Sequence, residues 1–132
     1  MDIELRDDGN CFVCGKDNAC GLKLSFNLLD GKIISEFTPS ILHQGYKNIT
    51  HGGIITALLD EAMIQAALSE GMSPVTAEIN VRFRKPLIAG QRSLIEAEIK
   101  RKGARLIEAR ARLTSAADGK VIAEAHAKLL IK

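Results

Sequence analysis

The feature that most constrains this chain is a predicted helix that is apolar on every side. The run from His51-Gly52-Gly53 to Glu70 contains no proline and no further glycine, and Gly71 after it is typical of a C-terminal cap. Its apolar residues point in all directions around the helix axis: Ile54, Ile55, Ala57, Leu58, Leu59, Ala62, Met63, Ile64, Ala66, Ala67 and Leu68. Such a helix must be buried. In a chain of 132 residues, a single helix can be buried on all sides only if a curved sheet wraps around it.

The rest of the sequence predicts that sheet. Asp30-Gly31 and Asp118-Gly119 are strong hairpin signals, and residues 38–50 are predicted to form a loop. Alternating apolar and polar residues, bounded by turn signals, predict strands at 22–28, 33–37, 75–83, 93–101, 104–115 and 121–131. We therefore expect one α+β domain over residues 1–132, a curved antiparallel β-sheet wrapped around one long central α-helix. Residues 1–21 of this domain are expected to form an irregular, cysteine-containing lead-in.

Composition excludes several classes of function. The chain has 18 basic and 16 acidic residues, and the resulting net charge of +2 is too small for a protein that binds nucleic acid through bulk charge. No apolar run approaches the ~18 residues of a membrane span, and the acidic N-terminal sequence is the opposite of a signal peptide. We expect a soluble, cytoplasmic protein that binds neither nucleic acid nor membrane.

Two adjacent carboxylates, Asp60 and Glu61, interrupt the apolar helix. At about 100° per residue, Asp60 lies between Ala67 and Ile64, whereas Glu61 shares its side of the helix with Gln65. A carboxylate among apolar groups is costly unless something compensates its charge. Asp60 is in the third turn, where the helix dipole has faded. We therefore expect Asp60 either to pair with a basic side chain of the sheet or to have a function.

The start of the helix is a second candidate for function. Amides at a helix N-terminus lack internal acceptors, and Gly52-Gly53 would let another molecule approach the backbone closely, as an oxyanion hole requires. His or Gly near a helix start is also common for structural reasons. Gly52 and Asp60 are eight residues apart, about 12 Å along a helix, so they cannot both contact one carbonyl within a single chain. Two antiparallel helices related by a two-fold axis could bring them together, which predicts a homodimer with two composite sites.

These residues resemble the hotdog-fold acyl-CoA thioesterases of the phenylacetic-acid-degradation (PaaI-like) type. The resemblance runs from Gln44-Gly45 through His-Gly-Gly-Ile-Ile-Thr-Ala-Leu-Leu-Asp-Glu-Ala (51–62) to residues 76–83, and it includes the strand order on either side. It implies a hydrolase that converts an acyl-CoA to free acid and coenzyme A without a cofactor. It also implies a homodimer that assembles further into a homotetramer.

The resemblance assigns roles to individual residues. It implies that Asp60 is the catalytic carboxylate, either as nucleophile or as general base on a water, two routes that the sequence does not separate. The amide of Gly52, supported by Gly53, would polarise the thioester carbonyl. Thr76 would lie near the attacking group, and His51 would shape the pocket.

Substrate contacts form a second group. The similar segments include Gln44, Gly45 and Asn80, which we expect to contact substrate. Coenzyme A carries phosphates, and Arg82 and Arg84 are cationic candidates for them, as are residues 85, 101, 102 and 105. Two other functions stay open, a non-catalytic acyl-CoA-binding module and a hotdog hydratase or dehydratase that would use His51 with Asp60. The acyl chain and the tetramer geometry are not predicted.

The lead-in contains three cysteines, Cys11, Cys14 and Cys20. An odd number without a secretion signal argues against a disulfide framework. Three thiolates could bind zinc in a ribbon-like module, but a structural site needs four ligands and a second Cys-x-x-Cys is missing. We expect ordinary reduced cysteines and no metal.

Overall fold

The computed structural model describes residues 3–131, which form a six-stranded antiparallel sheet and one long helix. The strand order across the sheet is β1-β2-β4-β5-β6-β3, so β1 and β3 are its edges. The elements are β1 (Asn27–Leu29), β2 (Lys32–Phe37), the 3-10 helix η1 (Ile41–His43), α1 (Gly52–Ser69), β3 (Pro74–Phe83), β4 (Ser93–Lys102), β5 (Leu106–Ser115) and β6 (Val121–Ile131). The predicted α+β architecture is confirmed.

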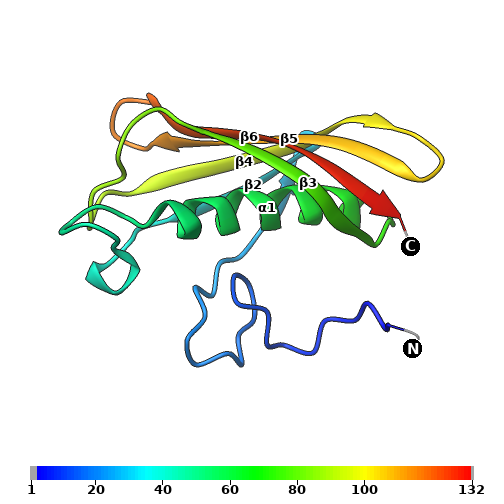
Figure 1. The fold of residues 1–132 in the computed structure, drawn as a ribbon, viewed down its shortest axis with the longest axis horizontal. Coiled ribbons are helices and arrows are strands. Elements are labelled where there is room, and N and C mark those ends of the chain that lie inside the picture. The colour runs from blue at the N-terminus through cyan, green and yellow to red at the C-terminus, as the bar shows by residue number, and fades with distance from the viewer. Residues whose placement is uncertain (1–2, 132) are drawn as a thin grey trace.

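The helix α1 lies against one face of the sheet and contacts five of its six strands (Figure 1). Its buried side chains are Ile55, Leu58, Leu59, Ala62, Met63, Ala66 and Ala67. They pack on the inward residues of β4, β5 and β6, which are alanines and branched aliphatic residues. The small side chains let the helix approach the sheet closely.

The side of α1 that faces away from the sheet is covered in part by the N-terminal segment, which crosses beneath the helix in Figure 1. Val13 and Leu24 belong to the core, and Cys11 and Leu22 pack against it. The sheet therefore supplies one side of the burial that the apolar helix requires, and the lead-in supplies part of the other. Ile54, Ala57 and Ile64 remain only half-buried.

One predicted strand is much shorter than expected. The strand is only Asn27–Leu29, so residues 22–26 of the predicted segment lie outside the sheet. Lys23 adopts a positive φ of 56°, and the amides of Leu22 and Leu24 donate to the carbonyls of Phe12 and Val13. The alternation correctly predicted that Leu22, Leu24 and Phe26 turn inward, but it was wrong for Leu28, which is 60% exposed, and the backbone of this segment bonds to the lead-in.

The hairpins follow their turn chemistry. Asp30 and Gly31 both have positive φ, 52° and 78°, as a tight two-residue turn between β1 and β2 requires. Gly71 has φ 83° directly after the helix, and its amide donates to Leu68 O.

Within residues 3–131, no helix combines the length and the apolarity that crossing a membrane requires.

Candidate functional site

Asp60 lies halfway along α1 and is held by a side chain from β3. Its Oδ1 accepts a hydrogen bond from Thr76 Oγ1 at 2.6 Å, and both residues are half-buried. Among residues 3–131, no basic side chain forms an ion pair with Asp60. The alternative expectation, that Asp60 pairs with a basic residue of the sheet, is therefore not met within this protomer.

Thr76 reaches Asp60 because β3 is irregular at this point. Simple alternation would put Thr76 on the outer face of the sheet together with Glu78. The pairing of β3 with β6 shifts between these two residues, so Thr76 lies opposite the buried Leu129 while Glu78 lies opposite the exposed Lys128. This β-bulge turns the threonine hydroxyl toward the helix.

His51 caps the start of α1. Its Nδ1 accepts a hydrogen bond from the Gly53 N–H at 2.8 Å, and its carbonyl accepts from Ile54 and Ile55. A Cβ at Gly53 would lie 3.0 Å from the imidazole, so glycine lets the ring fold over the helix end. Among residues 3–131, nothing accepts from the Gly52 N–H. Gly52, at the first helical position, is thus the amide left free to bind an anion.

The loop before the helix packs against this cap. A Cβ at Gly45 would lie 3.4 Å from His51 Cα, so the loop approaches the histidine closely. Gln44 lies beside Gly45, and its Oε1 accepts from the Asn48 amide, which keeps this side chain within its own loop. The structure therefore brings Gln44, Gly45, His51 and Gly52 together at one end of α1.

A groove of about 300 Å³ opens beside Gly52. Phe83 forms part of its wall, and its ring would lie 3.4 Å from a Cβ placed on Gly52. Arg84 and Lys85 line the groove as well, so Gly52 and two basic residues border the same space. Lys85 was among the cationic candidates from the sequence, whereas Thr50 and Phe83 were not singled out, because only the packing of the β3 end against the helix start brings them here.

Thr50 in this groove has an unusual hydroxyl. Among the buried side-chain nitrogen and oxygen atoms of the described residues, its Oγ1 is the one that has no hydrogen-bond partner. A buried hydroxyl without a partner destabilises the folded state. We expect Thr50→Val, which keeps the shape and removes this cost, to raise the free energy of unfolding by about 1 kcal/mol in a urea titration. A loss of stability would show instead that the hydroxyl is hydrogen-bonded.

The three predicted substrate contacts of the β3 region do not converge on Asp60 within one protomer. Asn80 lies on the outer face, where its side chain contacts Glu78. Arg84 Nε donates to Glu124 Oε1 at 3.0 Å, and this hydrogen bond, with the charges of Arg84 and Arg82, lowers the pKa of the Glu124 carboxyl. Arg84 alone of the three also borders the groove at Gly52.

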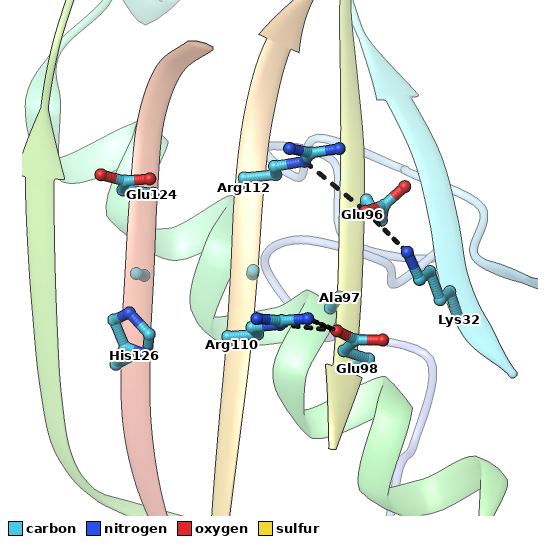
Figure 2. A pocket seen from close by; sticks show the side chains of 10 residues that line it. Lys32, Glu96, Ala97, Glu98, Arg110, Arg112, Glu124 and His126 are labelled. Carbon is cyan, nitrogen blue, oxygen red and sulfur yellow. Dashed lines mark hydrogen bonds and ion pairs between the residues drawn. The ribbon is translucent and has the colours of Figure 1, made fainter. Parts of the chain in front are cut away.

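The outer face of the sheet is a charged surface separated from α1 by the strands (Figure 2). Glu96 forms ion pairs with Lys32 at 3.4 Å and with Arg112 at 3.5 Å, and Glu98 pairs with Arg110. The two arginines are exposed, Lys32 and the two glutamates are half-buried, and each charge already has a partner. Solvent-screened pairs of this kind contribute little energy, and we assign this face no part of the site.

In the lead-in, the Cys14 thiol is not an activated nucleophile. Burial raises its pKa to about 12, and a hydrogen bond with Cys11 and the charge of Glu61 add to the effect. A reactive cysteine needs the opposite, a lowered pKa in an electropositive setting. The carboxylate of Asp60 is therefore the better candidate for the reacting group.

Comparison with known proteins identifies the sequence family. Residues 47–122 match the model of the thioesterase superfamily. The chain is 30% identical over 103 residues to human acyl-coenzyme A thioesterase 13, covering 76% of this chain and 74% of the relative. It is 31% identical over 62 residues to mouse acyl-coenzyme A thioesterase THEM4, covering 47% of this chain but only 26% of that longer relative.

Solved structures share the fold at lower identity. Protein RHA08564, a thioesterase superfamily protein, superposes with a TM-score of 0.86 at 24% identity, over 92% of this chain and 60% of that one. Escherichia coli PaaI, from the phenylacetic acid degradation operon, gives 0.77 at 21% identity over 83% of each chain. The smu.793 protein of Streptococcus mutans, bound to acetyl CoA, gives 0.77 at 19% identity, over 83% of this chain and 88% of that one. The predicted hotdog architecture is confirmed.

Proposed function

The chain belongs to the thioesterase superfamily and is a thioester hydrolase, and from this premise we propose that it cleaves acyl-CoA thioesters with Asp60 as the reacting carboxylate. The observation that carries the proposal is the hydrogen bond from Thr76 to Asp60. Asp60 lies on α1, and the first N–H of this helix, at Gly52, has no acceptor among residues 3–131. A positioned carboxylate and a free helix-start amide are the two groups that acyl transfer needs.

In the proposed reaction, Asp60 either attacks the thioester carbon or takes a proton from a water that does so. Both routes need the carboxylate charged and fixed in orientation. Thr76 supplies the orientation, because its hydroxyl donates to Oδ1 and leaves Oδ2 available to the substrate or to water. Thr76 is thus a positioning residue.

The amide of Gly52 stabilises the negative charge that develops on the thioester oxygen. Within one chain this amide lies about 12 Å from Asp60 along the helix axis, too far for both to contact one carbonyl. The site is therefore composite: Asp60 of one protomer acts with Gly52 of the partner subunit. A two-fold axis makes two such sites in each homodimer.

The edge of the sheet supports this dimer. Strand β3 is ten residues long, stands at the end of the strand order and pairs only with β6 among the described residues. A long unpaired edge is a template for another strand, and a two-fold axis would pair β3 with its own copy in antiparallel fashion. Thr76 is on this strand, so the same contact would bring the Asp60 region to the subunit boundary. Further assembly to a tetramer stays a prediction.

Acyl-CoA as substrate is supported by three observations. Two relatives carry the name acyl-coenzyme A thioesterase, and a protein of the same fold was solved with acetyl CoA. In this chain, the groove beside Gly52 is bordered by Arg84 and Lys85, which can neutralise coenzyme A phosphates. Of the predicted substrate contacts, Arg84 and the Gln44-Gly45 loop fit this role, whereas Asn80 and Arg82 would need a neighbouring subunit.

The test is a thiol-release assay over a panel of acyl-CoAs with aliphatic and aromatic acyl groups. We expect release of coenzyme A with saturation kinetics, and a preferred acyl group within the panel. Binding of acyl-CoA without thiol release would instead indicate a binding module. Addition of water across an enoyl-CoA with the thioester intact would indicate a hydratase, an alternative disfavoured because the Nδ1 atom of His51 is engaged as the helix cap.

A further inference from the structure

The thiols of the lead-in meet a carboxylate of α1. Ligand atoms of Cys11, Cys14 and Glu61 all lie within 4.8 Å of one another, and all three residues are half-buried. Cys11 Sγ lies 3.2 Å from Glu61 Oε1. Around a tetrahedral zinc ion, neighbouring S and O ligands stand roughly 3.5–3.8 Å apart, so these atoms need only small adjustments to surround one ion.

The turn between the two cysteines fixes their spacing. The Gly15 amide donates to Cys11 O at 2.8 Å, which folds the Cys-x-x-Cys segment back on itself. A Cβ on Gly15 would lie 2.4 Å from Cys11 N and 2.6 Å from Gly9 O, so only glycine fits. Both sulfurs therefore point to one side of a compact turn, as a metal-binding Cys-x-x-Cys requires.

The carboxylate of Glu61 is held by neutral donors, the Cys11 thiol and the Gln65 amide. No basic side chain among residues 3–131 forms an ion pair with Glu61, although it lies on an apolar helix next to two thiols. Gln65 Nε2 instead donates to Glu61 Oε2 at 3.0 Å, which orients the carboxylate toward Cys11. Metal ligands are typically oriented by such outer hydrogen bonds.

We propose that Cys11, Cys14 and Glu61 bind one zinc ion, which fastens the lead-in to the helix that carries Asp60. Two thiolates and a carboxylate suit zinc better than magnesium or calcium, which prefer oxygen ligands alone. A cavity of about 340 Å³ lies beside the cluster, and a water in it can supply the fourth ligand. This assignment replaces the expectation of ordinary cysteines, and it does not depend on the thioesterase proposal.

The sequence offers fewer than four cysteine ligands, which was the reason to expect no metal. Cys20, the third cysteine of the lead-in, lies away from the other two. It is exposed and is not part of the cluster. This makes Cys20→Ser a matched control, since it removes a thiol from the same segment without touching the proposed site. Cys14→Ser and Glu61→Gln each remove one ligand with little change in volume.

Elemental analysis of the untagged, full-length protein, purified without chelator, tests the site first. We expect about one zinc per chain in the wild type and in Cys20→Ser, and at least a tenfold lower content in Cys14→Ser and Glu61→Gln. Chelation should lower the Tm of the wild type and of Cys20→Ser, with little effect on the two ligand variants. Equal zinc in the wild type and in Cys14→Ser would overturn the proposal, because the ion would then be bound elsewhere.

Cobalt substitution of the wild-type protein keeps the test decisive if a variant fails to fold. Reduced, metal-free protein titrated with Co²⁺ alone should develop sulfur-to-cobalt charge-transfer absorption and the visible bands of a tetrahedral ion, and Zn²⁺ should bleach both. Absence of these bands would overturn the proposal. So would a Cys11–Cys14 disulfide in the isolated protein whose reduction restores no metal binding, since the pair would then be a redox couple.

Discussion

Replacement of Asp60 by asparagine is expected to lower kcat for acyl-CoA hydrolysis by at least about 1000-fold, some 4 kcal/mol of transition-state stabilisation. The amide is neither a nucleophile nor a base under these conditions. It can still accept the Thr76 hydrogen bond through its own Oδ1, so the helix and the β3 bulge should persist. Thiol release measured at saturating substrate, together with a thermal melt, separates lost chemistry from lost structure.

A matched control uses another acid near the same helix. Glu70 caps the C-terminal end of α1, where it pairs with Lys102 at 2.6 Å, far along the helix from Asp60. Glu70→Gln should leave kcat within about twofold of the wild type, because an exposed pair contributes little. Activity that survives Asp60→Asn, or falls equally in both variants, would contradict the role of Asp60.

Replacement of Gly52 by proline is expected to lower kcat by about 100- to 1000-fold, the usual cost of losing one oxyanion-hole donor. Proline removes the N–H but is well tolerated at the first position of a helix, where that N–H makes no helical bond. The preceding residue, His51, has φ −60° and ψ 132°, a conformation that a following proline permits. The substitution therefore deletes a donor and retains the helix.

Gly52→Ala is the control for the added bulk. Its Cβ would stand 3.4 Å from the Phe83 ring, an ordinary contact, and its N–H remains in place. We expect alanine to retain most of the activity and proline to lose it, in the same thiol-release assay. If alanine is as damaging as proline, the glycine is needed for space in the groove and not for its amide.

Much of the fold could be predicted because its signals are local. Hairpins at Asp30-Gly31 and Asp118-Gly119, the glycine stop at Gly71 and the apolar helix each depend on a few neighbouring residues, and the structure confirms them. The segment 22–26 was wrongly predicted as strand because its backbone partners are carbonyls of the lead-in. Side-chain alternation predicts which side of a segment is buried, but it does not predict which groups the backbone hydrogen-bonds to.

The same difference between local signals and long-range contacts applies to the site residues. Asp60 could be singled out because a carboxylate among apolar helix residues is costly wherever the helix packs. The orientation of Thr76 toward it was not derivable from alternation, since a bulge between Thr76 and Glu78 reverses the face. The Glu61 contact with Cys11 spans fifty residues of sequence, so no local pattern could reveal it.

The claim that each active site takes Asp60 from one subunit and Gly52 from the other has a direct measurement. Asp60→Asn and Gly52→Pro chains are co-expressed with different affinity tags, and the mixed dimers are isolated through both tags. Each mixed dimer contains one site with an intact Asp60 and an intact Gly52, and one site with neither. We predict about half of the wild-type kcat per dimer from two nearly inactive parents. Mixed dimers no more active than their parents would contradict the composite site.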